Sequence, residues 1–171
     1  MPTRTARPKA GRTAADIMSS PLVSLNPDAT LEEAAVALSE NNISGAPVLD
    51  FDGTPVGVVS LFDIVSHLAG LKRPGEEPGG FYRYAYPKFK EGGEGWEGGW
   101  EETTLDETKA LPIADAMTSD IISVPDRLAL EDVVRMMWKR RIHRIFVERE
   151  GRLVGVISTM DLLRVMAGGR R

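Results

Sequence analysis

The chain has 171 residues, of which 42% are hydrophobic and 27% charged, with a formal net charge of −4 at pH 7. This composition is typical of a globular protein with a buried core, and the negative charge argues against general nucleic-acid binding. Because the chain has no cysteine and two histidines, disulfides, thiol-based redox sites and a histidine-rich metal cluster are excluded.

The sequence also carries no sign of membrane insertion or secretion. No apolar run approaches the ~20 residues that span a bilayer. The basic stretch at residues 1–12 has no apolar segment behind it, unlike a secretory signal. We therefore expect a soluble, cytoplasmic protein with no membrane partner, and we expect residues 1–14 and 169–171 to be disordered tails.

An internal repeat organises the chain. The stretch ADIMSSPLVSLNPDATLEEA (15–34) returns as ADAMTSDIISVPDRLALEDV (114–133), an offset of 99 (114 − 15). Farther on, GVVSLFDIVS (57–66) returns as GVISTMDLLR (155–164), an offset of 98 (155 − 57), which one deletion in the turn between them explains. We predict a first copy (15–70) and a second copy (112–168), separated by an unlike insert (71–111).

Both copies predict the element order β-α-β-β-α. In the first copy, a short apolar stretch (21–25) predicts a strand. Apolar residues at helical spacing predict the following helix: Leu31, Ala34, Ala35 and Leu38. Thr30 and Glu33 form a capping-box pattern at its start, whereas the second copy has Ala129 in the position of Thr30.

Two strands and a closing helix complete each copy. The strands at 45–50 and 55–60 meet at a turn containing Gly53, and the closing helix at 61–70 ends on a glycine suited to the C′ position. Copies this short bury little surface alone. Since their helices are apolar on one side, we predict an α/β fold in which two β-α-β-β-α repeats pack face to face about a pseudo-twofold axis.

The insert differs from the repeats in composition. Residues 81–90 are aromatic and basic, and the stretch from Glu91 to Glu107 has seven acidic residues and no basic one. The acidic and glycine-rich part favours a linker, while the aromatic residues favour a segment that orders against the repeats or a partner. Both interpretations stay open. The aromatic residues are Phe81, Tyr82, Tyr84, Tyr86, Phe89, Trp96 and Trp100.

A Ser-x-x-Asp pattern begins each closing helix, as Ser60/Asp63 and as Ser158/Asp161. The simplest interpretation is a capping box, with Ser at the N-cap and an acid at N3. The same helix N-terminus favours an anionic ligand, through its free N–H groups and its dipole. Capping and binding are compatible, and facing copies would bring these helix starts to clefts between them.

The full double pattern resembles a known family. Each copy opens with D-x-M-[ST]-S and closes with V-G-V-[VI]-S-x-x-D-[IL], which resembles tandem CBS domains, the Bateman module, over about 15–70 and 113–168. The resemblance implies a regulatory module that binds an adenosine-containing ligand, AMP, ADP, ATP or S-adenosylmethionine, in clefts between the copies. It implies that Asp63 and Asp161 accept hydrogen bonds from ribose hydroxyls, and that Ser60 and Ser158 contact ribose or phosphate.

The resemblance also groups further residues into two clefts. Opposite Ser158 and Asp161 it implies six residues of the first copy: Ser20, Pro21, Leu22, Ser44, Gly45 and Ala46. Opposite Ser60 and Asp63 it implies four residues of the second copy: Asp120, Ile121, His143 and Arg144.

The motif IHRIFV (142–147) distinguishes the two clefts. It resembles the His-Arg pairs that hold nucleotide phosphates in family members, and Arg144 offers a fixed fork of donors for phosphate. The first copy has Ser44-Gly45 in the matching place. We therefore expect the two clefts to differ in phosphate affinity.

These observations predict a free-standing sensor whose regulatory ligand is an adenine nucleotide or a related compound and which signals to a protein target that the sequence does not identify. The alternative is a ligand-free interaction scaffold that uses the insert. No nucleophile–base pair, phosphate-binding loop or dinucleotide-binding glycine pattern occurs, so we expect no catalytic residues, no required cofactor and no metal.

Family members commonly dimerise through the closing helices. We expect a homodimer through two apolar faces: Phe62, Val65 and Leu68, and Leu162, Val165 and Met166.

Overall fold

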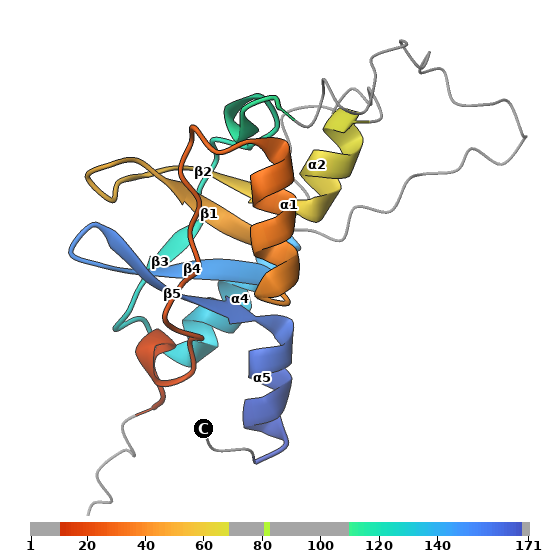
Figure 1. The fold of residues 1–171 in the computed structure, drawn as a ribbon. Helices are drawn as coiled ribbons and strands as arrows, with labels where there is room; N and C mark the ends of the chain where they lie inside the picture. Colours follow the sequence, from red (N-terminus) through yellow and green to blue (C-terminus); the bar gives the residue numbers. More distant parts are fainter. Residues whose placement is uncertain (1–10, 69–80, 83–109, 169–171) are drawn as a thin grey trace, which may run out of the picture.

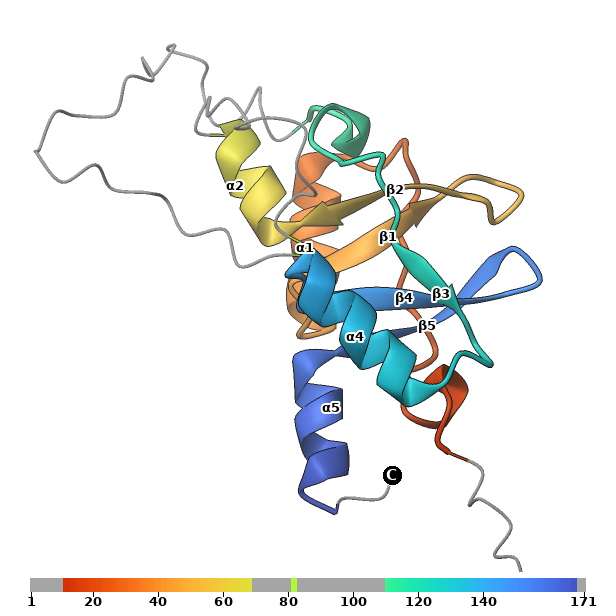
Figure 2. The ribbon, with the colours of Figure 1, turned by 180° about the vertical axis from the view of Figure 1, so that it is seen from behind.

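The structure, a computed structural model of the chain, describes residues 11–68, 81–82 and 110–168. Most of the insert and of both predicted tails therefore lies outside the described residues. Figure 1 shows the two copies stacked on each other, with α1 and α2 beside the first sheet and α5 beyond the second. Seen from behind, α4 lies over the second sheet (Figure 2). The α/β fold of two packed repeats is confirmed.

The predicted elements form in order with one exception, and a short 3-10 helix lies at the start of each copy. In the first copy they are η1 (Ala14–Asp16), α1 (Leu31–Glu40), β1 (Gly45–Leu49), β2 (Pro55–Ser60) and α2 (Leu61–Leu68). In the second copy they are η2 (Ile113–Asp115), β3 (Ser123–Pro125), α4 (Leu130–Arg140), β4 (Arg144–Arg149), β5 (Arg152–Ser158) and α5 (Thr159–Met166). The strand predicted at 21–25 is the exception.

That strand is absent from the first sheet because of a proline. The second sheet has the order β3-β4-β5, and the Phe146 N–H of β4 donates to the Ile122 carbonyl at 3.0 Å. The repeat places Pro47 of β1 at the position of Phe146 (146 − 47 = 99). Proline has no N–H to donate. The first sheet therefore contains β1 and β2, and Leu25 makes only an isolated parallel bridge to Val48.

The predicted cap of α1 and the turn at Gly53 are confirmed, while the glycine predicted to end the first closing helix lies outside the described residues. Thr30 caps α1, since its Oγ1 accepts from the Glu33 N–H at 3.2 Å and its own N–H donates to Glu33 Oε2 at 2.8 Å. Ala129 precedes α4 without a side-chain cap. Gly53, in the turn between β1 and β2, has φ of +79°, which a residue without a Cβ adopts at no steric cost.

The leading segment of each copy, residues 12–19 or 111–118, packs on the opposite copy. Ser19 exchanges two backbone hydrogen bonds with Val156 of β5, at 2.7 and 3.0 Å. Thr118 exchanges two with Val58 of β2, at 2.9 and 2.8 Å. Figure 1 shows the result, with η1 (red) beside the second copy and η2 (green) beside the first.

The exchange completes both hydrophobic cores. Ala14 and Ile17 from the start of the first copy are buried in the core of the second. Ile113 and Ala116 from the start of the second copy are buried in the core of the first. Each copy therefore depends on the other for part of its buried apolar surface, which is the main favourable term in folding.

None of the helices within residues 11–68, 81–82 and 110–168 is long and apolar enough to cross a membrane. In the same part of the chain, no three His, Asp or Glu side chains gather as a possible metal site.

Candidate ligand site

Ser158 and Asp161 form a closed capping box at the start of α5. Asp161 Oδ2 accepts from the Ser158 N–H at 2.9 Å and from the Ser158 hydroxyl at 2.6 Å. The Asp161 N–H donates back to Ser158 Oγ at 3.3 Å. The simple capping interpretation is therefore confirmed, and it uses one of the two carboxylate oxygens.

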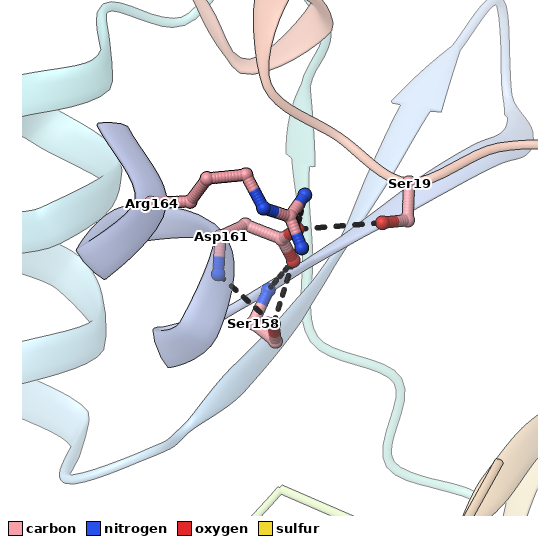
Figure 3. Close-up of polar contacts among 4 residues, drawn as sticks. All are labelled: Ser19, Ser158, Asp161 and Arg164. Atoms are coloured by element: carbon pink, nitrogen blue, oxygen red, sulfur yellow. Dashed lines mark hydrogen bonds and ion pairs between the residues drawn. The ribbon is translucent and has the colours of Figure 1, made fainter. Parts of the chain in front are cut away.

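The second oxygen, Asp161 Oδ1, faces other partners. Ser19, which comes from the first copy, donates its hydroxyl to Oδ1 over a long 3.5 Å contact. Arg164, one turn along α5, approaches Oδ1 at 3.3 Å. Figure 3 shows Ser19 reaching the carboxylate from one side and Arg164 from the other. Asp161 is thus a buried carboxylate, 6% exposed, at a point where both copies meet.

The first copy repeats the box with nearly the same distances. Asp63 Oδ2 accepts from the Ser60 N–H at 2.9 Å and from the Ser60 hydroxyl at 2.6 Å. Ser60 and Asp63 are 2% and 4% exposed. The two Ser-x-x-Asp motifs are therefore equivalent in local geometry, and any difference between the clefts must come from their surroundings.

The remaining predicted residues lie at the starts of β1 and β4 or close to the leading segments. The Ser44 carbonyl accepts from the Leu61 N–H, and Gly45 pairs with Ser60, both within the first copy. The His143 carbonyl accepts from the Thr159 N–H, and Arg144 pairs with Ser158, both within the second copy. Their grouping across the copies stays a prediction.

On the leading segments and in the core, exposure varies. Ser20, Pro21 and Asp120 are exposed. Leu22 and Ile121 are half-buried against the second core, and Ala46 is buried in the first.

Two residues of the insert lie in this region. Phe81 and Tyr82 are 2% and 0% exposed. The Phe81 ring stacks on Phe146, with centroids 4.8 Å apart, and the Tyr82 ring meets Phe146 edge-on at 6.0 Å. At these two residues the insert orders against the repeats, one of the two interpretations left open by its composition.

The environment shifts two pKa values. Burial, with a contribution from the neighbouring Arg144 charge, lowers the pKa of His143 to about 4, although a hydrogen bond with the Tyr82 backbone acts in the opposite direction. The imidazole is therefore neutral at pH 7. Burial raises the pKa of Tyr82, the hydrogen bond from the Ile122 backbone opposes this, and the Asp120 carboxylate adds to the rise.

Ser19 makes a cross-copy contact with Asp161 that the sequence analysis missed. The sequence analysis assigned the neighbouring residues Ser20, Pro21 and Leu22 to the Ser158/Asp161 cleft instead. A signal was available in the repeat. Ser19 matches Thr118 at the same offset of 99 (118 − 19), and a hydroxyl recurs there in D-x-M-[ST]-S. Both residues form backbone bridges to the strand that ends in Ser-x-x-Asp of the opposite copy.

Comparison with known proteins identifies related chains. The family model for the CBS domain matches residues 14–70 and 113–168. The uncharacterized protein MJ1426 of Methanocaldococcus jannaschii is 30% identical over 158 residues, covering 88% of this chain and 89% of the relative. The chloroplastic CBS domain-containing protein CBSX1 of Arabidopsis thaliana is 29% identical and covers 82% of this chain. The chain spans 57% of the length of CBSX1.

Solved structures share the fold. The CBS domain pair of MJ0100, in complex with 5′-methylthioadenosine and S-adenosyl-L-methionine, has a TM-score of 0.63 and 21% identity. CBSX2 in complex with AMP has a TM-score of 0.63 and 22% identity. Each comparison covers 92% of this chain and 98% of the other.

Proposed function

The chain belongs to the CBS domain family, and we propose on that premise that it is a regulatory module, with no catalytic role, that binds an adenosine-containing ligand between its copies. The ligand is AMP, ADP, ATP or S-adenosylmethionine, and its presence is signalled to a protein target. Two structures of the same fold support the ligand class, since one contains AMP and the other S-adenosyl-L-methionine.

The position of Asp161 carries the proposal. Its Oδ2 is committed to the cap of α5, while Oδ1 is directed toward the first copy, where Ser19 approaches to 3.5 Å. A ribose has two adjacent hydroxyls, and a buried carboxylate accepts such hydrogen bonds strongly because it is charged. The N–H groups at the start of α5 and the exposed Arg164 guanidinium add positive potential for a phosphate or carboxylate of the ligand.

Calorimetric titration of the full chain with AMP, ATP and S-adenosylmethionine tests the proposal. At least one should bind, and Asp161→Asn should weaken binding about tenfold or more, because hydrogen bonds to charged groups contribute about 1.5–3 kcal/mol. Glu33→Gln is the matched control, since Glu33 occupies the same N3 position in the α1 box. The proposal fails if none of the three binds at millimolar concentration, or if Asp161→Asn binds like the wild type.

An exposed apolar surface supports a homodimer. Figure 1 shows α2 and α5 on the same side of the molecule. Their exposed apolar residues are Leu61, Phe62 and Val65 on α2, and Met160, Leu163 and Met166 on α5. The sequence had placed Leu68, Leu162 and Val165 on this face, but these three are half-buried against their own cores, because the inner side of each helix packs on its sheet.

Sedimentation velocity tests the homodimer. The wild type should sediment as a dimer at micromolar concentrations, as expected for an interface of about 1,600 Å² in total. Val65→Glu with Met166→Glu should yield monomers, because each places a charge on the apolar face. Phe51→Glu is the control, since Phe51 is 85% exposed in the turn after β1. A wild type that sediments as a monomer would overturn the dimer and leave the ligand proposal standing.

A further inference from the structure

We propose that Phe81 and Tyr82 form an internal plug in the cleft predicted for Ser60 and Asp63, so that a ligand enters that cleft only by displacing them. The inference rests on the proposed function and deepens it. It makes the two clefts of the chain unequal, because Phe81 and Tyr82 occupy one of them.

Phe81 occupies a slot between the two copies. On one side is Gly45 of β1, where a Cβ would lie 2.6 Å from Cδ2 of the Phe81 ring. On the other side are Phe146, stacked at an interplanar angle of 11°, and the Arg144 guanidinium, whose carbon lies 5.3 Å from the ring centroid. A flat slot lined by a glycine, an aromatic face and a guanidinium also suits an adenine base.

Tyr82 accepts hydrogen bonds from two backbone N–H groups in the same region. Its carbonyl accepts from the His143 N–H at 2.7 Å, and its hydroxyl accepts from the Ile122 N–H at 2.7 Å. A ligand in this cleft would have to replace both acceptors, because a buried N–H without a partner is costly. The plug therefore makes hydrogen bonds to backbone N–H groups, and its rings also pack on the apolar side chain of Phe146.

The plug borders the residues predicted for this cleft. Gly45, which the sequence had grouped with the Ser158/Asp161 cleft, instead pairs with Ser60, and a Cβ on Gly45 would lie 3.2 Å from the Ser60 Cα. His143 and Arg144 contact the plug directly, and the Asp120 charge acts on the Tyr82 hydroxyl. The Ser158/Asp161 box instead meets Ser19 of the first copy. Phe81 and Tyr82 therefore compete with a ligand at the Ser60/Asp63 cleft, where Tyr82 also accepts from Ile122, just before β3.

Calorimetry with AMP in the Asp161→Asn background tests the plug, because that substitution weakens the other cleft. Adding Phe81→Ala should create a binding site that is at least about tenfold tighter than in the parent. Adding Asp63→Asn as a third change should abolish the new site. Circular dichroism shows whether each variant is folded. If Phe81→Ala does not fold, Phe81→Leu decides the matter, since leucine keeps an apolar side chain against Phe146 and lacks the flat ring that fills the slot.

The outcomes separate this inference from the proposed function. If the wild type binds AMP through Asp161 and the folded plug variants gain no site, the plug is wrong and the proposed function stands. If a new site forms but Asp63→Asn does not affect it, the plug fills some other space and the inference is wrong. If neither the wild type nor any variant binds AMP, ATP or S-adenosylmethionine, both fail.

Discussion

The thioether of Met18 fills the space that a side chain at Gly155 would need. A Cβ on Gly155 would lie 2.6 Å from the Met18 Sδ, and the reciprocal pair, Gly57 and Met117, gives 2.7 Å. Each methionine comes from the leading segment of one copy, and each glycine from the last strand of the other, β5 or β2. The methionine of D-x-M and the glycine of V-G-V recur in both copies because they meet in these two contacts.

Gly155→Ala should destabilise the protein by about 1–3 kcal/mol, because the new methyl group overpacks a filled contact. The measurement is the free energy of unfolding in urea. Gly11→Ala is the control, since a Cβ at Gly11 meets nothing within 4 Å. Combining Gly155→Ala with Met18→Ala should recover part of the loss. A Gly155→Ala protein as stable as the wild type would contradict the exchange of leading segments.

Ala129→Ser should stabilise the protein by about 0.5–1 kcal/mol. Ala129 is exposed, precedes α4 with φ of −60° and ψ of 138°, and offers no side-chain cap. A serine there can accept from the N–H of the first turn. The matched change is Thr30→Ala, which should cost a similar amount at α1. Thermal melts of the two variants should therefore shift in opposite directions, and a shift in the same direction would argue against the cap assignment.

Tyr82→Phe should cost about 1–3 kcal/mol of folding free energy, because it leaves the buried Ile122 N–H without the acceptor that now lies at 2.7 Å. The two rings and their stacking on Phe146 remain in this variant. Chemical denaturation measures the loss. A loss below about 0.5 kcal/mol, the usual range for surface changes, would mean that Tyr82 does not make this hydrogen bond in solution.

The pH dependence of stability should show the effect of His143. Its pKa is about 4 in the folded protein and near 6.5 when unfolded, so the unfolded chain binds more protons between these values. The contribution of His143 is therefore fully present above pH 6.5 and is lost as the pH falls toward 4. Unfolding free energies measured at several pH values should fall more steeply for the wild type than for His143→Gln. Parallel slopes would contradict the shift.

Local patterns predicted the local structure well. The helical spacing from Leu31 to Leu38 became α1, the box at Thr30 and Glu33 formed, and the turn at Gly53 has the expected positive φ. The strand at 21–25 failed although its residues suit a strand, because strand formation also needs a donor on the partner. Pro47 removes that donor, and the sequence of the strand itself holds no sign of it.

The candidate site was predicted in part. Ser158 and Asp161 were identified because a motif repeated in both copies placed them at helix starts, and their cap geometry confirms the local interpretation. Ser19 was missed because its role depends on the leading segment crossing to the other copy. A periodic pattern shows which face of an element is apolar and does not show which copy that face packs on.

The sequence by itself determined the repeat, the order of the elements apart from the strand at 21–25, the capping boxes and the family, because these depend on residues near one another in the chain or on the match between the copies. Only the tertiary structure decided that the copies exchange leading segments, that Ser19 meets Asp161, and that Phe81 lies between Gly45 and Phe146. These contacts join residues far apart in sequence. They form because each copy alone leaves apolar surface exposed, and the packing that buries it is a property of the whole chain.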